Sequence, residues 1–433
     1  MLSFWIFTNY LLNNLKEEQI MKLKKLMTTS LVVAITSAMM FTGCGGSKSE
    51  EKTADGKTKV RFASWDTAED VDRQQKIVDQ FNAAHDDIEV VLEAYGGEFD
   101  TKISAGMGSG DAPDVMYMWD YPSYYKGLEP LDSYIEKEGA DYKDNFYDTL
   151  WAYNSLNGTT YGIPVGFTTH CLFYNKDIFA KAGVAEPTSD WTWSDVQKAA
   201  KEIASKLDGV KGFSFQMKPD PYDFEMYLWS NGSAYLDKDG KKEGALNSKE
   251  SVEVLNLFQT MEKEGYAIAT EKSGTDDFRS GQVAMYVYGS WAISRLQEDG
   301  LNYGVTTIPA FEGKGKSKSI LSSSGVAISK DSKNKEAAWE FVKYWTSEEM
   351  NKERIGLELP VLHSVVEAEG IMKQPEFAPF YTMLEQSEGT TPASFLTENW
   401  AELRDTLSLS FEQVFNPSAM DDPKAVLDEA AME

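Results

Sequence analysis

The spacing of apolar residues switches repeatedly between the period of a β-strand and that of an α-helix along this chain. Residues 59–63 alternate between polar and apolar, residues 77–84 repeat apolar side chains at helical spacing, and residues 88–92 again have a strand pattern. This order predicts a βαβ unit with two parallel strands and a covering helix. Thr192 and Asp195 have the spacing of a capping box before a further helix. Apolar helix faces are predicted over residues 196–203, 254–261 and 337–345. The chain is therefore expected to fold as α/β layers.

Length, charge and cysteine content exclude several classes of protein. A chain of 433 residues is long enough for two domains with cores of their own. Its net charge of −27 argues against nucleic acid as a partner, because phosphates need a basic surface. Cys44 and Cys171 allow one disulfide at most and no CxxC motif, and the three histidines are too widely spaced for a zinc motif. We expect no metal and no other cofactor, and we expect Cys171, next to Leu172 and Phe173, to be a buried thiol.

The N-terminal region has the layout of a secretory signal. A lysine cluster over residues 22–25 precedes residues 26–41, an uncharged run that is shorter than the roughly 20 residues needed to span a bilayer. The run ends in Phe41-Thr-Gly-Cys44, which resembles a bacterial lipobox with Phe41 in place of the usual leucine. We therefore expect residues 21–43 to be a lipoprotein signal peptide and Cys44 to be the lipidated first residue of an extracytoplasmic protein. Residues 44–58 would be a flexible tether to the cell membrane.

Residues 1–20 precede a second methionine, Met21, from which a signal of ordinary length would begin. Lys16, Glu17 and Glu18 can be encoded by AAGGAGGAA, a purine-rich ribosome-binding sequence. Our hypothesis is that residues 1–20 belong to an upstream leader and that translation starts at Met21; the alternative is a long signal that starts at Met1. Codons unlike AAGGAG at these positions would contradict the hypothesis.

Four separated motifs resemble the extracellular carbohydrate-binding proteins of ABC importers, the maltose-binding-protein-like group of solute-binding proteins. They are GDAPDVMYMWD (Gly110–Asp120), YNKDIFAKAGVAEPTSDWTW (Tyr174–Trp193), GQVAMYVYGSWAI (Gly281–Ile293) and ELPVLHSV (Glu358–Val365). In the last motif, His363 stands near a position where the family commonly has a basic residue. The motifs occur in the family's order, and the resemblance covers the chain from about Val60 to its end.

This resemblance implies a two-lobed α/β clamp of the periplasmic-binding-protein type, which closes over a sugar by bending at a hinge. It places one lobe at residues 59–167 plus 306–357 and the other at residues 168–305 plus 358–433. The closed form would deliver the sugar to a membrane permease, which works with a separate ATPase. The resemblance also implies a monomeric receptor without enzymatic activity.

Strand ends supply the first candidates for contacts with the solute. Sugars have apolar C–H faces and rims of hydroxyl groups, so they need both aromatic side chains and hydrogen-bonding groups. Trp65 and Asp66 directly follow the first predicted strand, and Asp120 follows a strand predicted over residues 114–119. Open α/β sheets bind their ligands at such strand ends. As alternatives, Trp65 would cover the core and Asp66 would cap the next helix.

The family resemblance adds further candidates. Trp291, within GSWAI, is expected to stack on a sugar ring. Tyr222 and Trp400 lie where the family commonly places other aromatic side chains, and Tyr95 lies in a loop expected to face the cleft. His170 is a candidate for the cleft near the predicted crossing between the lobes.

Other functions stay open at this stage. A glycoside hydrolase also combines aromatic side chains with a pair of carboxyl groups, although nothing in the sequence marks a pair among the 69 acidic residues. The same fold with another solute is the second alternative. A polyamine would need several carboxylates around an aromatic box, a glycerol phosphodiester would need cationic residues, and a metal ion is a further possibility within this fold.

Overall fold

The computed structural model describes residues 52–356 and 358–432. The expected signal peptide, the lipidation site Cys44, most of the tether and the choice of start codon lie outside these residues. At the end of the expected tether, Gly56 N donates to Thr53 O in a turn. Lys52 forms an isolated antiparallel β-bridge with Thr58, the first residue of β1. No helix among the described residues is long and apolar enough to cross a membrane.

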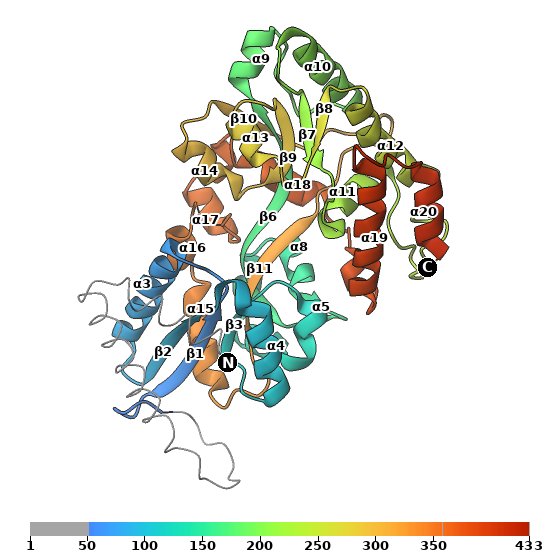
Figure 1. The fold of residues 1–433 in the computed structure, drawn as a ribbon. Helices are drawn as coiled ribbons and strands as arrows, with labels where there is room; N and C mark the ends of the chain where they lie inside the picture. The colour runs from blue at the N-terminus through green and yellow to red at the C-terminus, as the bar shows by residue number, and fades with distance from the viewer. Residues whose placement is uncertain (1–51, 357, 433) are drawn as a thin grey trace, which may run out of the picture. The chain divides into compact units, whose positions relative to one another are not determined.

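Within the described residues, a nine-stranded mixed sheet forms the framework (Figure 1). Its strand order is β2-β1-β3-β11-β6-β9-β7-β8, and β10 also pairs with β6. The strands are β1 (Thr58–Ser64), β2 (Ile88–Ala94), β3 (Val115–Met118), β6 (Gly162–Asn175), β7 (Phe213–Gln216), β8 (Ala267–Thr270), β9 (Met285–Gly289), β10 (Tyr303–Thr306) and β11 (Leu321–Ile328), with β4 (Ser155–Leu156) and β5 (Thr159–Thr160) in a separate ribbon. The two predicted N-terminal strands are confirmed as β1 and β2, which pair in parallel as the βαβ prediction requires.

Strand β6 belongs to two parts of this sheet. Residues 162–169 pair with β11, whereas residues 170–175 pair with β9 and β10. We call β1, β2, β3, β11 and residues 162–169 the first half of the sheet, and residues 170–175 with β7 to β10 the second half. Every residue of β6 is buried, which is the pattern of a strand covered on both faces.

Helices surround both halves. Those of the N-terminal part are α3 (Glu69–Ala84), α4 (Phe99–Ser109), α5 (Tyr121–Tyr124), α6 (Asp132–Glu138), α7 (Ala140–Asp144), α8 (Asp148–Tyr153), α9 (Lys176–Ala182), α10 (Trp193–Lys206) and α11 (Pro221–Asn231). Those that follow are α12 (Lys249–Lys263), α13 (Thr275–Arg279), α14 (Ala292–Glu298), α15 (Lys335–Trp345), α16 (Glu348–Glu353), α17 (His363–Ala368), α18 (Ala378–Gln386), α19 (Trp400–Phe415) and α20 (Pro423–Met432). Short 3-10 turns lie at η1 (Gly96–Glu98), η2 (Tyr125–Gly127), η3 (Ile371–Lys373) and η4 (Ala393–Phe395).

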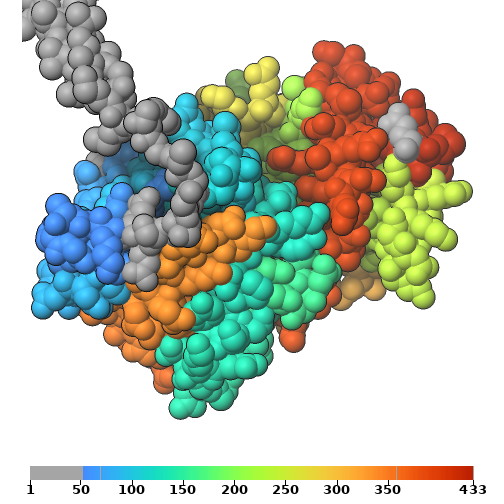
Figure 2. All heavy atoms as spheres, turned by 90° about the horizontal axis from the view of Figure 1, so that it is seen from below, coloured from blue at the N-terminus to red at the C-terminus, as the bar shows by residue number. Residues whose placement is uncertain are grey.

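Aromatic side chains pack the first half against α3 and α15, whose apolar faces were both predicted. Phe62 of β1 meets Phe341 and Trp345 of α15, with ring centroids 5.1 and 4.8 Å apart. Phe81 of α3 lies 5.2 Å from Phe341. Figure 2 shows the orange surface of the α15 region beside the blue surface of the N-terminal strand and helix, although the two are far apart in the sequence. The late helix therefore completes the core of the first half.

The second half is packed around Trp193, the first residue of α10. Its ring meets Phe213 of β7 and Phe258 of α12 at 5.7 and 5.3 Å. The predicted capping box before α10 is confirmed, since Asp195 N donates to Thr192 Oγ1 and Thr192 N donates to Asp195 Oδ2. The hydrogen bonds that Thr192 N and Thr192 Oγ1 donate to the carboxylate lower the pKa of Asp195. Both predicted helix faces of this half are confirmed as α10 and α12.

Candidate functional site

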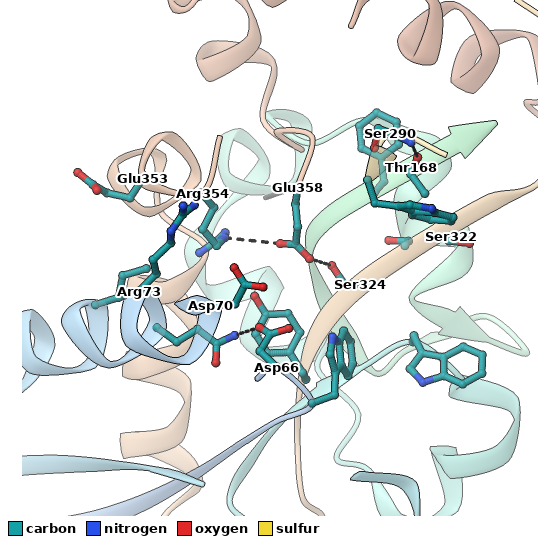
Figure 3. Close-up of a pocket in the computed structure, with 18 of the residues that line it drawn as sticks. Asp66, Asp70, Arg73, Thr168, Ser290, Ser322, Ser324, Glu353, Arg354 and Glu358 are labelled. Carbon is teal, nitrogen blue, oxygen red and sulfur yellow. Dashed lines mark hydrogen bonds and ion pairs between the residues drawn. The ribbon is translucent and has the colours of Figure 1, made fainter. Parts of the chain in front are cut away.

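A cavity of about 770 Å³ is lined by residues of both halves of the sheet (Figure 3). Three strands, β1, β3 and β9, run toward it and end at its wall. Trp65 follows β1, Trp119 follows β3, and Trp291 comes two residues after β9. The carboxyl ends of strands are where open α/β sheets bind ligands, so the fold itself places these tryptophans at a binding position.

The three tryptophans form most of an aromatic wall, which Tyr117 and Phe167 complete. Trp65 is fixed by edge-on contacts with Tyr117 at 4.9 Å and with Phe99 at 5.4 Å. Trp119 and Trp291 instead remain 51% and 44% exposed. Large exposed aromatic side chains in a concave site offer flat faces that a ligand can cover.

Trp291 is held in place although much of its ring is exposed. Its ring lies perpendicular to those of Tyr288, at 5.3 Å, and His170, at 5.7 Å. Gly289 passes so close to the indole that an added Cβ atom would lie 2.7 Å from two of its carbons. Next to it, Ser290 N donates to Thr168 Oγ1 at 2.8 Å, which ties the turn after β9 to β6. The indole is therefore a preorganised surface.

The opposite side of the cavity is charged. Figure 3 shows Asp66, Asp70, Arg354 and Glu358 turned toward one another, with side chains from α3, from the segment before it and from the residues after α16. Gln74 Nε2 donates to Asp66, and Ser324 Oγ donates to Glu358 Oε1 at 2.6 Å. Burial first, and then the neighbouring carboxylates of Glu358 and Asp70, raise the pKa of Asp66 to about 6.

Arg354 is the buried cation of this group. Its side chain is 4% exposed, its Nη1 donates to Trp345 O at 2.7 Å, and its guanidinium group lies 5.3 Å from the centre of the Trp345 ring. Its Nε lies 3.7 Å from Glu358 Oε2, which is an ion pair but too long for a hydrogen bond. Burial raises the pKa of Glu358, and the charge of Arg354 opposes that rise.

Several polar atoms of this cluster are buried without any hydrogen-bond partner. They are Gln74 Oε1, Arg354 Nε, Arg354 Nη2 and Glu358 Oε2. Most buried polar atoms in folded proteins are paired, because an unpaired one costs about 1–3 kcal/mol. Unpaired donors and unpaired acceptors therefore lie next to one another in the charged side of the cavity, each covered by neighbouring protein atoms.

Three of the predicted site residues, Trp65, Asp66 and Trp291, line this cavity. The alternative that Asp66 caps the next helix is wrong, because Ala68 stands at the N-cap of α3 and no side chain caps that end. The roles of the three residues in binding remain predictions.

The other five candidates lie outside the lining of this cavity. The hydroxyl of Tyr95 donates to Glu93, and its ring lies 6.3 Å from that of Phe99 at a tilt of 48°. Asp120 caps α5 by accepting from Ser123 N at 3.3 Å. The remaining three are His170, Tyr222 and Trp400.

His170 is 3% exposed within β6, and burial lowers its pKa to about 4. It borders a small separate cavity of about 60 Å³. The hydroxyl of Tyr222 donates to Leu321 O at 2.7 Å, next to the serines of β11 that line the large cavity. Trp400 begins α19 and packs against the core.

Four residues at the cavity were not predicted from sequence patterns: Trp119, Gln74, Arg354 and Glu358. Trp119 could have been found, because it ends the predicted strand directly before Asp120. Glu358 opens the motif ELPVLHSV, but that motif supported only the family resemblance and did not indicate a contact with the solute. Gln74 and Arg354 have no local signal, since their burial at the cavity depends on the packing of α3 against the chain after α16.

Cys171 is buried and free, as predicted, and burial raises its pKa. Among residues 52–356 and 358–432, no group of three or more His, Cys, Asp or Glu side chains is arranged to hold a metal ion.

Known proteins resemble both the sequence and the fold. The arabinooligosaccharide-binding protein of Bacillus subtilis is 25% identical over an alignment 448 residues long, and this alignment covers 95% of this chain and 99% of that protein. An ABC substrate-binding protein of Listeria monocytogenes, solved in complex with cycloalternan, has a TM-score of 0.73 and 25% identity, with 87% of this chain and 97% of that chain covered. A Mycobacterium tuberculosis protein solved in complex with glycerophosphocholine has a TM-score of 0.75 at 18% identity over 87% of this chain and 97% of its own. The last likeness shows the fold alone.

These likenesses confirm the predicted fold, a two-lobed α/β solute-binding architecture. The profile of the bacterial extracellular solute-binding proteins matches residues 65–352, more than half of the chain. The matched span contains all three tryptophans of the cavity and, of its charged group, Asp66 and Asp70. This chain therefore belongs to the bacterial extracellular solute-binding proteins.

Proposed function

We propose that this protein is the lipid-anchored, extracytoplasmic receptor of an ABC importer for a carbohydrate, in particular an oligosaccharide. It captures the sugar by closing at a hinge and delivers it to the membrane permease. The observation that carries the proposal is the composition of the large cavity, which combines exposed tryptophan faces with unpaired hydrogen-bonding atoms.

The two sides of the cavity match the two sides of a sugar. Trp119 and Trp291 offer exposed indole faces for the apolar C–H surface of a ring. Arg354 holds unpaired N–H donors, and Gln74 and Glu358 hold unpaired oxygen acceptors, all of them buried in this form of the site. Each hydroxyl group of a sugar both donates and accepts, so the hydroxyls can pair with these atoms once closure turns the side chains toward the solute. The oligosaccharide relative of Bacillus subtilis and the cycloalternan complex support the same class of solute.

The charges that line the cavity come close to balance. The acidic side chains are Asp66, Asp70, Glu353 and Glu358, and the basic side chains are Arg73, Lys76 and Arg354. A glycerol phosphodiester or a polyamine would therefore be repelled by one set while it is attracted to the other. A neutral, hydroxyl-rich molecule meets no such repulsion.

Hinge closure requires contacts from both lobes, because a ligand shifts an equilibrium only by binding one state better. We assign the lobes as residues 59–167 plus 306–357 and residues 168–305 plus 358–433. The change of partners along β6, from β11 up to residue 169 to β9 from residue 170, supports a crossing near this boundary. In this assignment Trp65 belongs to one lobe and Trp291 to the other, and both line the cavity.

The membrane attachment belongs to the same proposal. A lipid on Cys44 would keep the binding unit beside its permease, and the tether that follows would let the unit reach it. We expect the receptor to act as a monomer and to have no enzymatic activity.

Binding measurements test the proposed function. The chain from Gly45 to Glu433 would be titrated with mono- and oligosaccharides, polyamines and glycerophosphodiesters, following tryptophan fluorescence and melting temperature. A saturable response to a sugar whose mass is unchanged after incubation is the expected result. A response to polyamines or phosphodiesters alone would refute the assignment of a carbohydrate.

Product analysis is part of this test for a structural reason. Asp66 and Glu358 are two carboxyl groups in one cavity, both of raised pKa, and glycoside hydrolases also use two carboxyl groups, one of which has a raised pKa. Cleavage of a bound sugar, and its loss in Glu358→Gln, would identify an enzyme in place of a receptor.

A further inference from the structure

A second hollow, of about 570 Å³, shares Trp291 with the large cavity. Its walls come from residues 270–279 after β8 and from residues 288–295 around the start of α14. We propose that this hollow is a second compartment of the solute site, which binds those rings of an oligosaccharide that extend past Trp291. This inference rests on the proposed function, and it adds where the further rings of a longer oligosaccharide bind.

The topology of the second half places the hollow at the edge of the sheet where the carboxyl ends of its parallel strands lie. Strand β7 pairs in parallel with both β8 and β9, so the carboxyl ends of these three strands share one edge. Trp291 follows β9, and residues 270–279 begin at the end of β8. Ligands of open α/β sheets bind outside the carboxyl ends of strands, and the second hollow is lined by residues that follow β9 and β8, the strands on either side of β7.

Trp291 lines both the large cavity and the second hollow, so a solute that covers it borders both. Its contacts with Tyr288, His170 and Gly289 hold the indole in place, yet 44% of the side chain is exposed. A side chain that is already ordered loses little conformational entropy when a ligand stacks on it. Tyr288 also lines the second hollow, so the aromatic wall continues beyond Trp291.

The charges of the second hollow are balanced. Three acidic and three basic side chains line it, namely Glu271, Asp276, Asp277, Lys272, Arg279 and Arg295. Arg279 forms ion pairs with Asp276 and Asp299. Within the described part of the chain, Lys272 and Arg295 form no ion pair of their own, so their N–H groups can donate to a solute. A hollow without net charge that keeps free donors suits a neutral, hydroxyl-rich ring.

The test compares oligosaccharides of increasing length on the full chain. Arabino-oligosaccharides and galacto-oligosaccharides, from the disaccharide upward, would be titrated by calorimetry into the wild type and into the double variant Lys272→Ala/Arg295→Ala. The matched control is Lys238→Ala/Lys249→Ala, which removes the same charge from two exposed residues that line neither cavity. A melting curve checks that each variant is folded.

We expect the wild type to bind longer chains more tightly until a plateau. The double variant should lose about tenfold in affinity for the longest sugars and less than about twofold for the shortest that binds, because only the longest reach the second hollow. The control should match the wild type. Affinity that is independent of chain length, or an equal loss for short and long sugars, would overturn the inference while leaving the proposed function intact. A wild type that binds no sugar of either series but binds a charged solute would overturn both.

Discussion

Removing the indole of Trp291 is expected to weaken sugar binding more than removing the carboxylate of Asp66, although both line the same cavity. The two side chains differ in how much of their surface and hydrogen-bonding capacity is still free to contact a solute. Trp291 has an exposed apolar face that only a ligand can cover. Asp66 already accepts a hydrogen bond from Gln74 in the unbound protein.

The expected loss for Trp291→Ala follows from its exposed area. A side chain of this size can bury up to about 250 Å², so the 44% that is exposed leaves about 100 Å² for a ligand to cover. At about 25 cal/mol per Å², complete cover contributes about 2.5 kcal/mol, or about seventyfold in Kd. A ring that covers half of this area contributes about tenfold.

The expected loss for Asp66→Ala is smaller. One carboxylate oxygen is engaged by Gln74, and a net hydrogen bond contributes about 1 kcal/mol, or about fivefold in Kd. Calorimetry at neutral pH with the tightest sugar would measure both variants, and melting curves would confirm that they are folded. Trp291→Phe keeps an aromatic face and should recover part of the affinity. A larger loss for Asp66→Ala than for Trp291→Ala would refute the view that stacking dominates at this site.

Three further changes test the packing around the site and the fold. Gly289→Ala places a Cβ atom 2.7 Å from the indole of Trp291, so the ring must move; calorimetry should show an affinity lower by about tenfold, and an unchanged affinity would contradict the proposed packing. Burial raises the pKa of the Glu225 carboxyl group to about 8, whereas the unfolded chain has a value of about 4.3. The folded protein therefore holds the carboxyl proton more tightly than the unfolded chain does. The free energy of unfolding decreases as the pH rises from about 4.3 to about 8. Glu225→Gln should therefore melt higher than the wild type at about pH 8 and not at about pH 4, and the opposite order in a pH series of melting curves would rule out this linkage. Thr192→Ala removes the cap of α10 and should lower the free energy of unfolding by about 1 kcal/mol in a denaturant titration, whereas the exposed Thr188→Ala, the control, should change it by less than about 0.5 kcal/mol.

Local sequence patterns were sufficient for the βαβ opening and for the late helices. Strand β1, helix α3 and strand β2 lie where the periods of two and of 3.6 residues predicted them. The capping box of Thr192 and Asp195 is formed as its spacing predicted. These predictions succeed because the side-chain period and the capping of backbone N–H groups involve only neighbouring residues.

The candidate site was predicted only in part. Trp65 and Asp66 follow directly from the rule that ligands bind at strand ends, and Trp291 follows from a family motif. Asp120 also ends a strand, but its carboxylate caps α5 and it does not line the cavity. A strand end therefore indicates a region of the site, whereas the direction of each side chain depends on the turn that follows.

The sequence by itself determined the α/β class, the family, and the aromatic residues that its motifs carry. Only the tertiary structure decided which of the many charged residues belong to the site. Arg354 and Glu358 meet Gln74 and Asp66 because α3, β11 and the chain after α16 converge on one cavity. Burial there leaves donors and acceptors unpaired and raises the pKa of both carboxyl groups. Desolvation depends on every neighbour in space, and most of these neighbours are distant in the sequence, so no local pattern could have revealed it.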